Sequence, residues 1–97
     1  MSYKIFGKKK LMDEVYLIDI EAPDIVKTAK IGLFIIVKNN NEDNDISLEI
    51  IDYNKERKII TVVLQRIKDN IKKLELLKER DFIFDIMGPF RVPYVKY

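Results

Sequence analysis

The most regular feature of the chain is an alternation of apolar and polar residues with a period of two. In the segment 14–21, Tyr16, Ile18 and Ile20 share one face, and Asp19 and Glu21 lie on the other. Such alternation is typical of a strand that buries one face in a core. Comparable patterns, with a more polar one first, occupy the ranges 3–11, 31–38, 46–53, 58–66 and 82–87. The sequence therefore predicts about six strands.

One segment has a helical period instead. Four apolar residues recur there at spacings of four, three and three: Ile67, Ile71, Leu74 and Leu77. This spacing predicts a helix near 70–79, between the fifth and sixth strands. A second stretch, 24–29, has room for one helical turn after a strand-breaking proline. Strands separated mostly by short turns, with one helix before the last, predict an all-β fold with one short helix, as a small antiparallel barrel or sandwich.

Length and composition bound the function. The 97 residues predict one domain, assigned to 1–88, with a C-terminal tail at 89–97. A net charge of +2 gives no reason to expect nucleic-acid binding. The sequence holds no Cys and no His, which excludes disulfides, thiolate nucleophiles and a Ser–His triad. Redox chemistry would therefore need a cofactor to supply the reactive atom. No apolar run is long enough for a membrane span and no signal peptide is evident, so a cytoplasmic protein is expected.

Several short motifs occur in a fixed order along nearly the whole chain. They are Glu21-Ala22-Pro23, Gly32-Leu33-Phe34-Ile35, Ile51-Asp52-Tyr53, Thr61-Val62-Val63-Leu64-Gln65, Lys72-Lys73-Leu74 and Gly88-Pro89. In this order they resemble the FAD-binding barrel of the ferredoxin reductase-type family. That family includes the flavin subunits of sulfide dehydrogenase, ferredoxin–NADP reductase and the dihydroorotate dehydrogenase electron-transfer subunit. The resemblance implies a six-stranded antiparallel Greek-key β-barrel with a capping helix near 70–79.

The sequence departs from the family where the resemblance places the flavin. Family members carry an Arg in the fourth strand that pairs with the FAD pyrophosphate, and a Ser or Thr hydroxyl near the flavin ring. The matching segment here is Asp45, Ser47, Leu48 and Glu49, with Asp45 at the Arg position and Glu49 at the hydroxyl position. An Asp in place of Arg exchanges attraction to phosphate for repulsion.

The family's glycine-containing turn at the start of the capping helix is altered as well. It corresponds to the segment 68–71, where Lys68, Asn70 and Ile71 occupy positions of the flavin motif. A Gly there lets backbone N–H groups approach phosphate, and that Gly is absent. The chain also contains no G-x-G-x-x-G motif of a nicotinamide-binding domain. The departures predict a barrel that has lost flavin binding, carries no cofactor and acts as a protein-interaction or assembly module.

One alternative stays open. In this alternative, the chain is a minimal electron-transfer subunit that holds FAD or FMN with the help of Lys68 and Lys72, while another chain supplies the pyridine-nucleotide domain. In that case it is a component of a flavin-dependent oxidoreductase, since catalysis by side chains alone is not expected.

The loop 39–45 is rich in oxygen ligands but lacks the Gly and Glu of an EF-hand, so no metal site is predicted.

The tail supplies the candidate partner contact. Four apolar or aromatic residues are interleaved there with basic ones: Phe90, Tyr94, Val95 and Tyr97. They either pack on their own barrel or contact a second copy or another protein chain.

Overall fold

The computed structural model describes residues 3–38, 46–65, 82–83 and 85–91. In these ranges the elements are, in chain order, β1 (Tyr3–Met12), β2 (Val15–Glu21), α1 (Pro23–Val26), β3 (Phe34–Lys38), β4 (Ile46–Asn54), β5 (Ile59–Gln65), β6 (Phe82–Ile83) and β7 (Asp85–Phe90). The predicted all-β character with one short helix is confirmed. The described helix is α1, which begins one residue before the segment 24–29 expected to hold one turn and overlaps that segment, whereas the predicted helix near 70–79 lies outside the described residues.

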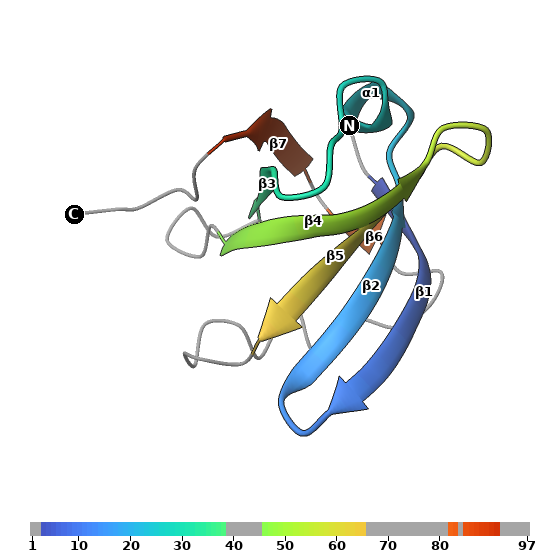
Figure 1. Cartoon of the computed structure of the whole chain (residues 1–97). Helices are drawn as coiled ribbons and strands as arrows, with labels where there is room; N and C mark the ends of the chain where they lie inside the picture. Colours follow the sequence, from blue (N-terminus) through green and yellow to red (C-terminus); the bar gives the residue numbers. More distant parts are fainter. Residues whose placement is uncertain (1–2, 39–45, 66–81, 84, 92–97) are drawn as a thin grey trace.

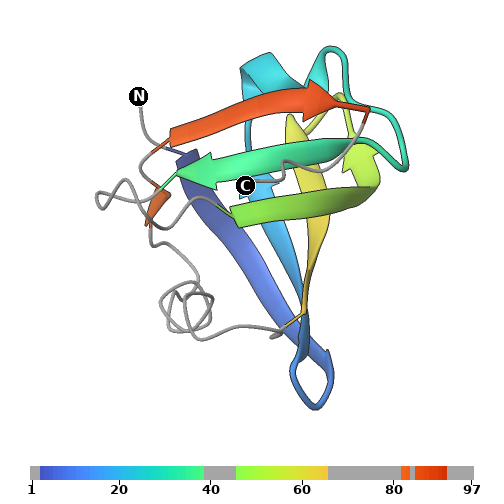
Figure 2. The same ribbon diagram turned by 90° about the vertical axis from the view of Figure 1, so that its left-hand side faces the viewer.

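All the strands join one antiparallel sheet in the order β6-β1-β2-β5-β4-β3-β7. The last predicted strand is divided in two: β6 pairs with β1, and β7 pairs with β3. The sheet curves so that the adjacent segments β6 and β7 lie at its two ends. Among the described residues β6 and β7 do not pair with each other, so the sheet is not closed there. Figure 2 shows β3, β4 and β7 running crosswise to β1, β2 and β5.

Strand β4 belongs to both parts of this sheet. Its first half, Ile46 to Glu49, pairs with β3, and its second half, Glu49 to Asn54, pairs with β5. A register shift between Ile50 and Asp52 lies in the second half. Such an irregularity bends a strand and increases its twist, which fits the long curved path of β4 in Figure 1.

The core lies between the two crossed parts of the sheet. It is built from the apolar faces that the alternation predicts, and its fully enclosed members are Ile5, Ile18, Ile20, Ile35, Val37, Ile50, Ile60, Val62 and Leu64. Among the described residues no charged residue is buried, and Tyr3 is the buried residue that carries a side-chain hydroxyl. Apart from Tyr3 the core is aliphatic and takes its specificity from packing.

One end of the core is covered by α1 and the turns around it. Ala22, Ile25, Val26 and Ala29 are all buried there. The Ala22 N–H donates to the Lys58 carbonyl at 2.9 Å, which ties the start of α1 to the β4–β5 hairpin. Figure 1 places α1 beside the start of β1.

The apolar run 31–38 is a strand over only part of its length. The Leu33 N–H donates to the Lys30 carbonyl at 3.1 Å, so residues 30–33 form a turn, and β3 begins at Phe34. Gly32 has φ +94° in this turn, a conformation that glycine adopts without strain.

Candidate functional site

The positions that match the family's fourth-strand flavin motif lie on β4, with their side chains on alternate faces. Ser47 and Glu49 are half-buried, whereas Leu48 is buried opposite Ile35. Leu48 therefore contributes its side chain to the core, and only its backbone could reach a ligand on the outer face. The structure does not describe Asp45, Lys68, Asn70 or Ile71.

Glu49 lies in the middle of an otherwise apolar row on the outer face of the sheet. It is opposite Phe34 of β3 on one side and Val63 of β5 on the other. Phe34 is in turn opposite Phe90 of β7. Residues directly opposite each other on antiparallel strands share a face. The structure thus brings a flavin-motif position, Glu49, and a tail residue, Phe90, onto one surface, although the sequence places them far apart.

This surface, which we call the β3–β7 face, is defined by Phe34, Glu49, Met87 and Phe90. Met87 is opposite Ile36 and is 42% exposed, and Phe90 is 39% exposed. No ion pair joins Glu49 to a cation within the described ranges. The Phe34, Met87 and Phe90 side chains can stack on an aromatic ring or bury apolar area against a protein. The Glu49 carboxylate, by contrast, disfavours the binding of an anion. Of the tail residues, Tyr94, Val95 and Tyr97 lie outside the described residues.

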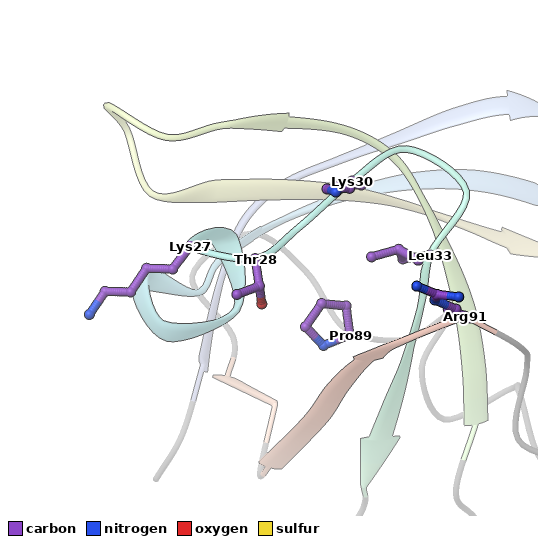
Figure 3. A pocket seen from close by; sticks show the side chains of 6 residues that line it. All are labelled: Lys27, Thr28, Lys30, Leu33, Pro89 and Arg91. Atoms are coloured by element: carbon purple, nitrogen blue, oxygen red, sulfur yellow. The ribbon is translucent and has the colours of Figure 1, made fainter.

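Sequence reasoning missed a cavity at the end of the sheet next to α1. Its volume is about 550 Å³, and Figure 3 shows the six residues that line it: Lys27, Thr28, Lys30, Leu33, Pro89 and Arg91. Three of the six are cationic and none is acidic. The cations come from the loop 27–33 and from position 91, which are distant in sequence. No spacing rule could therefore have grouped them.

A second, smaller cavity of about 210 Å³ lies on the outer face beside the β4–β5 hairpin. Its lining includes Asp19, Asp52 and Arg57. The Thr61 hydroxyl donates to Asp19 at 2.5 Å, and the Arg57 guanidinium lies 4.9 Å from the centre of the Phe6 ring. The polar groups of this cavity thus partly satisfy one another.

One titratable group in the described residues is strongly perturbed. Burial raises the pKa of Tyr3 to about 12, and the hydrogen bond to Asp24 and the charges of Asp24 and Asp85 act in the same direction. The Tyr3 hydroxyl donates to Asp24 Oδ2 at 2.7 Å. Such a tyrosine joins β1 to α1 and is not a general acid or base near neutral pH.

Neither a metal cluster nor a membrane-spanning helix is found in the described part of the chain. The carboxylates there form no group of three that could hold a metal ion. None of the described helices has the length and apolar character that a membrane crossing requires.

No family model matches the chain, but comparison with known proteins finds relatives in sequence, and two of them are informative. An uncharacterised protein in the adh 3' region of Clostridium beijerinckii is 42% identical over 91 residues, which are 94% of this chain and 31% of that protein. The electron transfer subunit homolog of dihydroorotate dehydrogenase B (NAD(+)) from Thermotoga maritima is 28% identical over 90 residues, which are 93% of this chain and 32% of that protein. The chain thus spans about a third of the length of these relatives.

A solved structure gives the same answer for the fold. The structure of an NADH-dependent reduced ferredoxin-NADP oxidoreductase, studied for flavin-based electron bifurcation, superimposes with a TM-score of 0.81 and 28% identity. The match covers 89% of this chain and 31% of that one. The similarity in sequence and the similarity in structure agree, and together they support a ferredoxin-reductase-like FAD-binding domain fold for this chain.

Proposed function

We propose that this ferredoxin-reductase-like module does not hold a flavin in the family's manner and works through contact with another protein chain. The observation that carries the proposal is Glu49 on the outer face of β4, flanked by Phe34 and Val63. The resemblance places this position near the flavin ring. A carboxylate in an apolar row is poorly solvated, so its repulsion of an anionic ligand such as a flavin nucleotide is screened less than in open water.

The rest of the β3–β7 face supports a protein contact. Met87 and Phe90 expose aromatic and sulfur-containing side chains beside Phe34. Aromatic residues and Met are enriched at protein interfaces because they bury large areas at low entropic cost. The Thermotoga relative is named as a homolog of an electron transfer subunit, and a subunit acts with another chain. We expect this chain to be a component of such an assembly.

A flavin titration tests the first half of the proposal. The purified chain is expected to be colourless and to show no saturable change in flavin fluorescence at about 100 µM FAD or FMN. The matched variant is Glu49→Thr, which places the family's hydroxyl at this position and is expected to bind FAD more tightly than the natural chain. Flavin absorbance in the purified protein, or equal affinities of the two chains, would contradict the proposal.

The second candidate is a flavin-binding electron-transfer module whose pyridine-nucleotide domain lies elsewhere. The observation in its favour is the similarity to the Thermotoga subunit homolog over 93% of this chain. If the natural chain does bind FAD, Lys68→Glu with Lys72→Glu should abolish the binding, because these lysines would be the remaining phosphate partners. Unchanged affinity in that double variant would exclude this arrangement.

A further inference from the structure

The cavity beside α1 has the size and construction of a small-molecule site. About 550 Å³ falls within the range of roughly 300–1,000 Å³ that such sites occupy. Its walls come from the loop that follows α1, from Leu33 just before β3, and from Pro89 and Arg91 at the end of β7. Figure 3 shows the side chains of Thr28, Leu33 and Pro89 grouped in the middle, and Lys27 extending away from the others.

Backbone hydrogen bonds hold the loop wall of this cavity in place. The Gly32 N–H donates to the Ile50 carbonyl at 2.9 Å, and the Ile50 N–H donates to the Leu33 carbonyl at 2.7 Å. The Thr28 N–H donates to the Ile25 carbonyl at 3.2 Å, and Ala29 is buried. A wall fixed to both α1 and β4 needs little ordering when a ligand binds, which lowers the entropic cost of binding.

The charges of the cavity favour an anion. Lys27, Lys30 and Arg91 all contribute to its lining, and none of them forms an ion pair with a carboxylate in the part of the chain that the structure describes. Cations gathered without acidic partners repel one another, and an anion relieves that repulsion. The Arg91 guanidinium and the Thr28 hydroxyl, on opposite sides of the cavity, can each donate to the oxygens of a phosphate group.

The remaining lining is apolar, which specifies the ligand further. Leu33 and Pro89 offer carbon surface between the polar groups. We propose that this cavity binds a small organic phosphate, with the phosphate at Lys30, Arg91 and Thr28 and the organic part against Leu33 and Pro89.

The lining of this cavity includes none of the β4 positions of the flavin motif that the structure describes, which are Ser47, Leu48 and Glu49. Glu49 is nevertheless near it, because it is opposite Phe34, the residue that follows Leu33. The proposed ligand is therefore held by residues other than those of the flavin motif.

The test is an NMR titration of the whole chain at constant ionic strength, with inorganic phosphate and phenyl phosphate as probes. We expect saturable shifts of the backbone amides of Thr28, Gly32 and Leu33, and tighter binding of phenyl phosphate because its ring covers Leu33 and Pro89. Non-saturating shifts, shifts confined to other parts of the chain, or equal affinity for the two probes would overturn the proposal.

Variants with matched changes in net charge separate this site from general attraction to a cationic surface. Lys30→Glu with Arg91→Glu is expected to weaken phenyl phosphate binding by at least about tenfold. The control, Lys9→Glu with Lys55→Glu, reverses two exposed lysines outside the cavity and should leave the affinity unchanged. Equal losses in the two double variants would overturn the proposal, and amide dispersion reports whether each variant is folded.

Discussion

Tyr3 shows how one buried hydroxyl links stability to pH. Its pKa of about 12 in the folded chain lies above the ordinary value of 10.0, so the folded state holds the proton more tightly than the unfolded state does. The resulting stabilisation is complete below pH 10 and is lost as the pH rises toward 12. We expect the free energy of unfolding to fall more steeply over this interval in the natural chain than in Tyr3→Phe, as measured by urea unfolding at several pH values. Parallel pH profiles would contradict this expectation.

The chain contains five tyrosines, so the titration of Tyr3 can also be followed directly. Ultraviolet absorbance of tyrosinate should show a late-titrating component that disappears in Tyr3→Phe. This second measurement reports on Tyr3 itself, because it does not depend on the lysines that also lose protons in this range.

Gly88 is required by both conformation and space. Its φ is +128°, and a Cβ built there would lie 3.0 Å from the Phe34 carbonyl oxygen and 3.4 Å from Ile35 Cα. Gly88→Ala is expected to destabilise the fold by about 1–3 kcal/mol, since neither neighbouring atom belongs to a flexible side chain.

Gly32 provides the matched control for this substitution. It also has a positive φ, +94°, but nothing lies within 4 Å of its added Cβ. Gly32→Ala therefore introduces conformational strain without a steric clash, and we expect a smaller loss of unfolding free energy than for Gly88→Ala in chemical denaturation. If Gly32→Ala were the more destabilising of the two variants, the close approach of Gly88 to β3 would not be the reason that glycine is required at position 88.

At the scale of the element, successive side chains of β4 alternate between the core and the outer face. Leu48→Ala removes a side chain that is 4% exposed and is expected to cost about 2–5 kcal/mol. Glu49→Ala, one position later on the outer face, is expected to change stability by less than about 0.5 kcal/mol. Thermal and urea unfolding of the two variants measure the difference. A large loss for Glu49→Ala would mean that this carboxylate has a structural partner and is not a free part of the β3–β7 face.

At the scale of the whole molecule, the order of strands predicts where the fold is most stable. Strands β2 and β5 are paired on both sides over most of their length, whereas β7 has one partner, β3, among the strands that the structure describes. Local opening is therefore more costly in β2 and β5. We expect their amides to exchange hydrogen most slowly, by NMR, and those of β7 to exchange faster. Slower exchange in β7 would indicate a further partner for that edge.

The sequence by itself determined which residues enter the core and which class of fold they build. Alternation at Ile18 and Ile20, at Ile46, Leu48 and Ile50, and at Ile60, Val62 and Leu64 correctly separates buried from outward faces, because the period of a strand is a local property of the backbone. The resemblance to the ferredoxin reductase-type family rested on local motifs in order, and it was confirmed by the relatives and by the solved structure. The altered flavin positions at Asp45 and Glu49 were also visible in the sequence, and their effect on flavin binding stays a prediction.

Only the tertiary structure decided how distant segments meet. The division of the last strand into β6 and β7 depends on which neighbour each half pairs with, and the turn at 30–33 depends on hydrogen bonds to Ile50. The β3–β7 face joins Glu49 to Phe90, and the cavity joins Lys30 to Arg91. Each of these two pairs is more than forty positions apart in the sequence. No periodicity encodes such contacts, because they are set by sheet order and register, which the chain acquires only when its long-range pairs form.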